Sequence, residues 1–407
     1  MNYGWPKIGH AAEMRSLSYH AKLRDRVESS GPAIETARHM RNYAVRDFAE
    51  GAWDIPEDFL QFGHFERVVR QLDMTSSPGY PYMLSATSNA IFFKAKDGVF
   101  DGSRLRTVYQ MVCAQIKERN VDPIRLFIKQ EPHKLEKLRD GRYRLISSVS
   151  VIDQIIDHML FGPMNDALRE NWLNVPSKIG WGPLRGGWKM MPRSKCVAID
   201  KSGWDWTVHP WLIEMVLEVR ARLCRNLTDD WMELALWRYK ALYLNPLFIT
   251  SGGLVLRQVR GGVMKSGCVN TISDNSIMQL LLHYRVCVEL GMEPGWVIAM
   301  GDDTLQEEIP ELQSYLDLLG RYAIVKQALP VTEFAGMRFD GMRVEPLYRG
   351  KHSYILLHLD PENIDQMAES YTLLYHRSVY CSIIEDVFAK MGAKLTCREV
   401  RDNTYDN

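Results

Sequence analysis

The sequence lacks a cysteine pattern for zinc binding, a membrane-spanning segment and a signal peptide. Its seven cysteines form no CxxC pair and no spacing typical of a zinc site. It has no run of about 18 apolar residues that could cross a membrane, and its first residues lack the charged-then-apolar order of a signal peptide. We therefore expect free, buried thiols, a reducing compartment such as the cytosol, and no integral membrane segment.

An excess of charge is also missing. Lysine and arginine together number 50, and aspartate and glutamate also number 50, so the formal net charge is zero. A protein that holds nucleic acid is more often basic, but a groove needs only local positive potential. The 407 residues, 46% of them hydrophobic, are enough for a globular chain of two or three subdomains. Composition alone leaves the function open.

Apolar runs and turn residues predict helices and strands that alternate along the chain. Helices are expected over 33–48, over 211–227 after an opening Pro210, from about 269 to a cap at Gly291, and from Pro310 to Gly320. Strands are expected at 195–200, 296–300, 321–327 and 332–339, and Asp340-Gly341 is a strong hairpin turn signal. The last 60 or so residues have mostly helical patterns. The interleaving predicts an α+β fold with an antiparallel sheet.

Carboxylates stand at the ends of two of these predicted strands. Asp302 and Asp303 follow an apolar strand and Gly301, whose freedom suits a tight turn. Two adjacent carboxylates repel each other, and a divalent cation relieves that repulsion. Asp200 ends a second apolar strand. If both strands belong to one sheet, Asp200, Asp302 and Asp303 can hold two Mg²⁺ ions, a site suited to nucleotidyl transfer. Taken alone, Gly301-Asp302-Asp303 also fits an ordinary Asp-rich surface turn, and Asp200 also fits a cap of the segment that follows it.

A second pattern has the chemistry needed to recognise a ribose. Ser266 and Gly267 lie in a loop, and Thr271 and Asn275 follow four residues apart, on one helical face. Asp205, five residues after Asp200, can approach the same point. Hydroxyl, amide and carboxylate groups together can both donate to and accept from a 2′-OH. Asn275 in isolation would equally suit a hydrogen bond within the core.

Residues 125–144 form a basic segment with seven basic and three acidic residues, a local excess of four positive charges. Arg142 and Arg144 alternate around Tyr143, so on a strand both would point to one face. Arginine suits bidentate phosphate binding. A solvated charged face is the simpler reading, but the apolar strand expected directly after Arg144 favours a phosphate clamp held against the core. The candidate phosphate ligands are Lys129, Lys137, Arg142 and Arg144.

Taken in this order, these elements resemble the motifs of positive-strand RNA virus polymerases. Asp200 and Asp205 match motif A, residues 266–275 match motif B, and Gly301-Asp302-Asp303 matches motif C. Residues 129–148 resemble motif F, with Arg144 at the place of the arginine that contacts the incoming triphosphate. The segments KQEPHK, RYRLISSVSVIDQ and GVMKSG are most similar to polymerase sequences of sobemoviruses, luteovirus relatives and sobemo-like viruses. The resemblance runs from about residue 75 to about residue 380.

Weaker matches extend this resemblance to RNA contacts and proton transfer. Residues 75–82 look like motif G at the template entrance, with Pro78 inserted where picornavirus polymerases have a small residue. Residues 334–339 are similar to the motif E hairpin that grips the primer end. Lys326 is the best match to the general-acid lysine of motif D, although the sequence around it is loose. The residues expected to contact template or primer RNA are Ser76, Ser77, Gly79, Tyr80, Gly267, Gly336 and Met337.

The resemblance implies a right-hand polymerase with an antiparallel palm sheet backed by helices. Residues 1–194 would form the N-terminal fingers and fingertips, residues 195–345 the palm with a fingers insertion at about 212–260, and residues 346–407 a short helical thumb. It implies two Mg²⁺ ions, replaceable by Mn²⁺, and template RNA, product RNA and NTPs as partners. It leaves room for a genome-linked protein primer and other viral replication proteins. The expected location is the host cytoplasm, where partners could bring the enzyme to membrane-associated replication sites.

Two other functions share part of this chemistry. A reverse transcriptase has the same paired aspartates, but it would place a bulky residue where Asp205 lies and would lack the match at Asn275. A catalytically silent RNA-binding descendant of a polymerase would be expected to have lost acids, and all of them are present here. The sequence therefore favours an RNA-dependent RNA polymerase.

Overall fold

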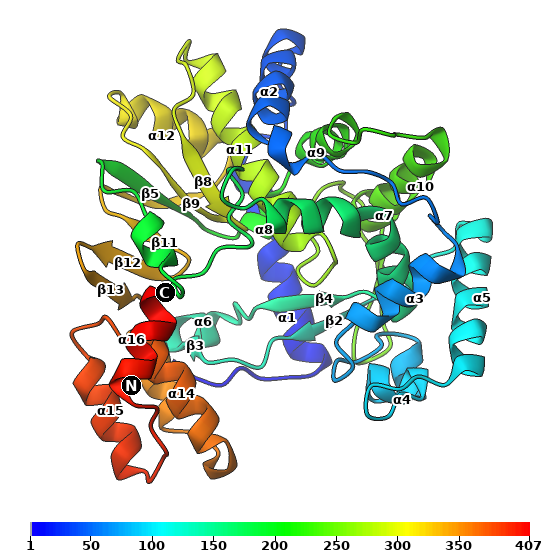
Figure 1. The fold of residues 1–407 in the computed structure, drawn as a ribbon. Coiled ribbons are helices and arrows are strands. Elements are labelled where there is room, and N and C mark those ends of the chain that lie inside the picture. The colour runs from blue at the N-terminus through cyan, green and yellow to red at the C-terminus, as the bar shows by residue number, and fades with distance from the viewer. Residues whose placement is uncertain (1) are drawn as a thin grey trace.

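The computed structural model describes residues 2–407, in which helices and strands alternate as expected (Figure 1). The helices are α1 His10–Ala21, α2 Ile34–Asp47, α3 Phe62–Gln71, α4 Asn89–Phe93, α5 Gly102–Glu118, α6 Leu135–Asp140, α7 Val151–Glu170, α8 Trp204–Thr207, α9 Pro210–Arg222, α10 Asp229–Tyr239, α11 Thr271–Glu289, α12 Leu312–Tyr322, α13 Arg349–Leu356, α14 Ile364–Leu374, α15 Cys381–Lys390 and α16 Arg398–Asp406. The strands are β1 Tyr3–Gly4, β2 Ile124–Ile128, β3 His133–Lys134, β4 Leu145–Ser148, β5 Cys196–Lys201, β6 Leu247–Ile249, β7 Val255–Arg257, β8 Val297–Met300, β9 Asp303–Glu307, β10 Val325–Leu329, β11 Glu333–Phe334, β12 Met337–Asp340 and β13 Arg343–Pro346.

The sheet that carries the predicted carboxylates has the strand order β10-β5-β9-β8 and is antiparallel throughout. Apolar residues of β5 and β8 alternate between its two faces, as expected for half-buried strands. Helix α11 packs against β8 and against α2, α9 and α12, so helices cover one face of the sheet (Figure 1). The predicted α+β class with an antiparallel sheet backed by helices is confirmed for this part of the chain.

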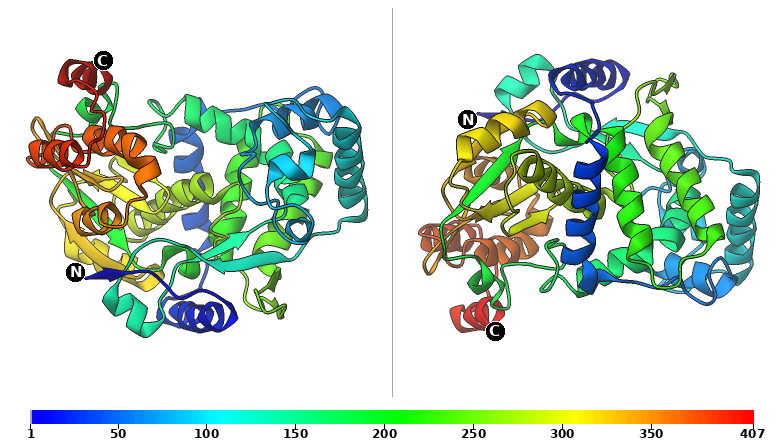
Figure 2. Two further views of the ribbon diagram at one scale, coloured as in Figure 1. Left: turned by 90° about the horizontal axis from the view of Figure 1, so that it is seen from below. Right: turned by 90° about the horizontal axis from the view of Figure 1, so that it is seen from above.

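Three further sheets surround this one. The order β4-β2-β6-β7 includes a parallel pair, β2 with β6, so not every sheet is purely antiparallel. Strands β11, β12 and β13 form a meander, and β1 pairs with β3. Figure 2 shows the C-terminal helices gathered at one end of the molecule and α5 at the other. The N-terminal strand β1 lies beside α13 at the C-terminal end.

A continuous hydrophobic core extends from Ala37 to Ala323, and the C-terminal helices α14 and α15 enclose a separate small cluster around Phe388. The predicted divisions at residues 194 and 345 stay predictions. No helix in residues 2–407 has the length and apolar content needed to cross a membrane. All seven cysteines are free, as predicted, but Cys113 and Cys397 are exposed rather than buried.

Buried ion pairs fix α11 against the helices beside it. The Arg220 guanidinium of α9 donates to one carboxylate oxygen of Asp274 at 2.6 and 3.0 Å, and the Tyr239 hydroxyl donates to the other at 2.8 Å. All three side chains are buried. Removing one partner of such a buried pair typically costs about 3–5 kcal/mol. The network therefore holds the N-terminal turn of α11, which precedes Asn275, in a fixed position.

Several predicted element boundaries were wrong, including the single strand expected at 332–339, which a turn divides into β11 and β12. Helix α9 ends at Arg222 rather than at residue 227, and the Thr228 hydroxyl caps a new helix by accepting from the Trp231 amide. Helix α12 begins at Leu312 and continues through Gly320 to Tyr322, so the next strand starts at Val325 rather than at residue 321. Tyr315, Leu319 and Tyr322 form one buried face of α12. That packing outweighs the weak helix propensity of the glycine.

Other predicted boundaries were right. Gly291 has a φ of 69° directly after α11, as a C-terminal cap requires. Asp340 pairs with Arg343 across a two-residue turn that contains Gly341, which confirms the predicted hairpin. The turn between β8 and β9 contains Asp302, also as predicted.

Candidate active site

The three predicted metal carboxylates lie at one edge of the central sheet. Ile199 of β5 pairs with Thr304 of β9, and Met300 of β8 pairs with Asp303. Strand β9 therefore lies between β5 and β8, so Asp200 lies beside the start of β9 and not beside β8. The β8–β9 turn brings Asp302 to the same edge (Figure 1). The condition that both strands share one sheet is met, with one strand between them.

Helix α11 holds the β8–β9 turn in place. Gly301 has a φ of 64°, in the left-handed region that favours glycine, and its amide donates to the Ser276 hydroxyl at 2.9 Å. Ser276 follows Asn275 directly, so the same helical turn that carries Asn275 also fixes Asp302. Sequence reasoning missed Ser276, because a buried serine in a helix gives no signal of its long-range partner.

Burial and mutual repulsion disfavour the charged forms of these acids. Burial raises the pKa of Asp302, although its side chain remains open to solvent, and the charge of Asp200 adds to the shift. Burial, followed by the charges of Asp302 and Asp200, raises the pKa of Asp303 to about 6. Such a group of carboxylates is stabilised by positive charge.

Two lysines supply positive charge at this edge. Lys201 is buried behind the acids, where burial lowers its pKa to about 8 and the charges of Asp302 and Asp200 oppose that shift. Its Nζ donates to the Thr304 hydroxyl at 3.2 Å. Lys326 of β10 donates to Asp200 Oδ2 at 2.5 Å. Lys326 was predicted as a site residue, whereas Lys201 was missed, because a lysine beside an aspartate ordinarily indicates a solvated strand end.

The donor set fits a hard divalent cation in its chemistry, since carboxylate oxygens are the ligands that Mg²⁺ prefers. Among residues 2–407, however, no three histidine, cysteine, aspartate or glutamate side chains are arranged closely enough to hold a metal ion. Lys326 instead neutralises Asp200.

The predicted ribose-recognising residues meet as expected at Asp205 and Asn275. Asn275 Nδ2 donates to Asp205 Oδ1 at 2.9 Å, and the Trp204 indole N–H donates to Asn275 Oδ1 at 2.8 Å. Burial raises the pKa of Asp205 to about 6, the bond from Asn275 lowers it, and the charge of Asp302 raises it. The charge of Asp302 acts on Asp205, so this pair lies within electrostatic range of that predicted metal ligand. Trp204 orients the Asn275 amide and was not predicted.

The loop residues predicted beside this pair have other bonds. The Thr271 hydroxyl donates within its own loop, to the carbonyls of Lys265 and Cys268 at 2.9 and 2.8 Å, and accepts from the Gly267 amide at 3.3 Å. The Ser266 carbonyl accepts from the Ser147 amide at 2.7 Å. In the described part of the chain, Thr271 therefore shapes the loop and does not join the Asp205–Asn275 pair.

The basic segment faces the carboxylates through Arg144. The charge of Arg144 lowers the pKa values of Asp205 and Asp302, which places its guanidinium near both acids. Arg144 Nη1 also donates to Glu131 Oε1 at 2.8 Å. Strand β4 begins at Leu145, directly after Arg144, as expected. Arg142 and Arg144 precede the strand, so the condition that both lie on it is not met.

The other predicted phosphate ligands lie around Arg144. Lys129 is 3.5 Å from Glu131, and Arg142 pairs with Asp140 at 2.9 Å. Burial lowers the pKa of Lys137, and the charges of Lys326 and Arg142 add to the shift. Lys137 therefore belongs to the same positive region as Lys326 and Arg142.

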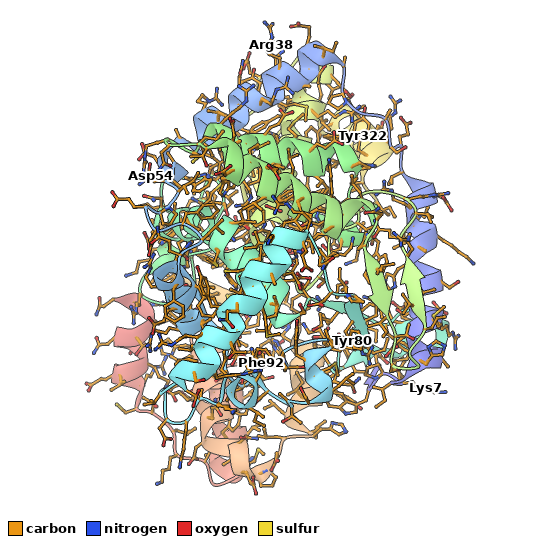
Figure 3. All side chains as sticks on the ribbon, turned by 90° about the vertical axis from the view of Figure 1, so that its right-hand side faces the viewer. Lys7, Arg38, Asp54, Tyr80, Phe92 and Tyr322 are labelled. Atoms are coloured by element: carbon orange, nitrogen blue, oxygen red, sulfur yellow. The ribbon has the colours of Figure 1, made fainter. Side chains whose placement is uncertain are left out.

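The residues predicted to contact template RNA lie in a loop tied to α7. The Pro78 carbonyl accepts from the Val151 amide at 2.8 Å, and Gly79 has a φ of 69°. The Asp73 carboxylate accepts from the Ser76 hydroxyl at 2.6 Å. In Figure 3, Arg38 of α2 lies at the top of the view and Tyr80 lies in its lower half. The Ser77 hydroxyl accepts from the Gly79 amide at 3.3 Å.

The predicted primer-contact residues occupy the turn between β11 and β12. Gly336 has a φ of 76°, and Met337 begins β12. A Cβ added at Gly336 would lie 3.0 Å from the ring of Tyr348, which follows β13. Burial raises the pKa of Tyr348, and the charges of Asp303 and Asp200 add to it, so this turn lies near the acids.

The comparisons with known proteins identify a polymerase family. Residues 64–319 match the family model described as viral RNA-dependent RNA polymerase. The chain is similar to the replicase polyprotein P2AB of Southern cowpea mosaic virus, at 31% identity over 331 residues, covering 74% of this chain and 33% of the relative. It is 36% identical over 331 residues to replicase polyprotein P2AB of Southern bean mosaic virus, covering 75% of this chain and 33% of that relative.

One relative of similar length is itself named as an RNA-directed RNA polymerase. The RNA-directed RNA polymerase of Mushroom bacilliform virus is 27% identical over 350 residues, which cover 79% of this chain and 83% of the relative. By contrast, the chain spans about a third of the length of the two replicase polyproteins. The resemblance to sobemovirus and luteovirus-related polymerases, predicted from the motifs, is confirmed by these similarities.

Proposed function

Because the chain belongs to the viral RNA-dependent RNA polymerase family, we propose that it extends RNA under the direction of an RNA template. The reaction transfers a nucleoside monophosphate from an NTP to an RNA 3′-hydroxyl and releases pyrophosphate. The observation that carries this proposal is the hydrogen-bonded Asp205–Asn275 pair, on which the charge of Asp302 acts. A group that can bind a 2′-OH thus lies within electrostatic range of a group that can bind metal.

We propose that Asp200, Asp302 and Asp303 hold two Mg²⁺ ions, with Mn²⁺ as a possible substitute. When bound, such a pair activates the attacking hydroxyl and neutralises the leaving pyrophosphate. The raised pKa values of Asp302 and Asp303 support this role, because a bound cation stabilises the charged carboxylates against the burial and mutual repulsion that raise those values. Members of this polymerase family generally use divalent metal ions.

The remaining residues of the site would bind and orient the nucleotide. Arg144, with Lys129, Lys137 and Arg142 near it, would donate to the triphosphate oxygens. Asp205 and Asn275 would bind the ribose 2′-OH, and Ser266 and Thr271 would shape the loop beside the sugar. Lys326, once released from Asp200, would donate a proton to the leaving pyrophosphate.

We also propose a subdomain layout, RNA contacts, partners and a location for the chain. The chain would adopt the fingers, palm and thumb layout with the divisions given above. Residues 76–80 and Gly267 would contact the template, and Gly336 and Met337 the primer end. Template and product RNA, a genome-linked protein primer and other viral replication proteins are the proposed partners. The proposed location is the host cytoplasm, at membrane-associated replication sites reached through those partners.

The test is an extension assay with purified protein, Mg²⁺ and radiolabelled nucleotides on an RNA template, with and without an annealed primer. Parallel reactions contain a DNA template of the same sequence or 2′-deoxynucleotides. RNA-templated incorporation of ribonucleotides alone supports the proposal. Incorporation of deoxynucleotides with equal efficiency would identify a reverse transcriptase-like enzyme, and no incorporation under any condition would identify a silent descendant.

A further inference from the structure

Glu131 binds cations that come from two distant parts of the chain. Its Oε1 accepts from Arg144 at 2.8 Å, and its Oε2 accepts from Lys351 of α13 at 2.8 Å. Lys129 lies 3.5 Å from the same Oε2. The Glu131 side chain is only 16% exposed. Hydrogen bonding from Lys351 and the charge of Arg144 outweigh burial and lower the pKa of Glu131 to about 2. The Glu131 carboxylate thus connects Arg144, which we propose binds the triphosphate, with the C-terminal helices.

The contact with Lys351 belongs to a packed junction. The N-terminal strand β1 pairs with β3, directly after Glu131 in the chain, and the Leu135 amide donates to the Asn2 carbonyl at 2.9 Å. The ring of Tyr3 packs against Tyr354 of α13 at 6.4 Å between centroids. The backbone near Glu131 and the backbone of α13 are therefore held together independently of the ion pair. Substitution of Lys351 should consequently leave the junction in place.

A carboxylate and a triphosphate offer Arg144 the same kind of acceptor oxygen. Because the Arg144 side chain is 57% exposed, an anion in the site can reach its guanidinium. From this geometry we propose that Glu131 competes with the nucleotide triphosphate for Arg144, and that Lys351 sets the strength of this competition by binding the second carboxylate oxygen. The inference rests on the proposed role of Arg144 and adds Glu131 and Lys351 as positioning residues.

The proposal predicts opposite effects of two substitutions. Glu131→Gln removes the competing anion and should lower the KM for nucleotides by about two- to fivefold, the range expected for a partly exposed ion pair. Lys351→Met leaves Glu131 with fewer cations to bind, so Glu131 holds Arg144 more strongly and the KM rises by a similar factor. A purely structural role would weaken activity in both variants.

The experiment measures kcat and KM for single-nucleotide incorporation on a preformed primer–template complex of the full chain. Glu136→Gln controls for loss of one negative charge, because Glu136 is exposed in the same segment and has no ion pair in the described residues. Lys390→Met, at the exposed end of α15, controls for loss of one positive charge. Both controls should keep the wild-type KM. The opposite shifts should shrink as salt is raised, since the competition is electrostatic.

The double variant decides whether Lys351 acts through Glu131. In the Glu131→Gln background, Lys351→Met should have no further effect on KM. A persistent effect, or a raised KM in Glu131→Gln alone, overturns the inference. If Glu131→Gln does not fold, as a thermal melt would reveal, Glu131→Asp replaces it and should lower the KM in part. Arg144→Ala separates the two hypotheses: an unchanged KM in that variant refutes the proposed role of Arg144 itself.

Discussion

Substitution of Asn275 tests the proposed ribose recognition most sharply. Asn275→Ala removes the 2.9 Å bond to Asp205, and with it one of the groups that would bind the 2′-OH. A site built to bind a hydroxyl rejects an analogue that lacks it, because its own polar groups are left unpaired. One such bond is worth roughly 0.5–1.5 kcal/mol, and more when charged, so the preference for ribonucleotides should fall by roughly three- to thirtyfold.

The assay compares kcat/KM for UTP and for its 2′-deoxy analogue on one RNA template. The ratio does not depend on the fraction of active protein, because the same enzyme processes both substrates. This matters because Asn275→Ala also removes the acceptor of the Trp204 indole N–H. Trp204→Phe loses the same indole bond but keeps Asn275 and Asp205, so it should lower the ratio less than Asn275→Ala does.

The same pair predicts a dependence on pH. The pKa of Asp205 is raised to about 6, so Asp205 is charged above that pH and becomes neutral as the pH falls through it. The ribonucleotide preference should therefore decrease between about pH 7 and pH 5 in the wild type. Asn275→Ala should shift this decrease to higher pH, because the bond from Asn275 lowers the Asp205 pKa. A ratio that is unchanged in Asn275→Ala and Asp205→Ala at every pH would show that the sugar is recognised elsewhere.

Substitutions at three further positions test separate parts of the site. Arg144→Ala should raise the KM for all four nucleotides, because a charge-assisted phosphate contact is worth roughly 1.5–3 kcal/mol; steady-state kinetics with an unchanged KM would mean that Arg144 serves only its ion pair with Glu131. Lys326→Leu should slow the chemical step by about 10²–10⁴-fold in single-turnover kinetics, and Lys326→His should recover part of the rate. Loss of nucleotide affinity with a normal chemical step would make Lys326 a phosphate ligand. Gly301→Ala should lower kcat because its φ of 64° strains any residue with a Cβ, and a normal kcat would show that the turn tolerates a shift.

The strand-end acids could be predicted because each one follows an apolar run that has to be buried. Asp200 and Asp302 are local breaks in a hydrophobic pattern, and a sheet brings such breaks to a common edge. Asp205 and Asn275 could be paired from the expected order of the elements. The chemistry of the site is therefore visible in the sequence wherever a polar residue interrupts a regular pattern.

The remaining features depend on tertiary contacts that leave no local signal. Helix α12 passes through Gly320 because Leu319 and Tyr322 pack into the core. Lys201 is buried behind the acids, although a lysine after an aspartate reads as an exposed strand end. The bond between Glu131 and Lys351 joins residues 220 positions apart. No pattern within one segment could have indicated these contacts.

The central claim is tested most directly by Asp302→Asn in the primer-extension assay, with RNA binding measured on the same protein. Asp302 would hold metal, and metal stabilises the transition state rather than the bound RNA. The account predicts that Asp302→Asn abolishes nucleotide addition but binds template RNA nearly as the wild type does, whereas Asp317→Asn, on the exposed side of α12, keeps both properties. Normal extension by Asp302→Asn with Mg²⁺ as the only divalent ion would contradict the account.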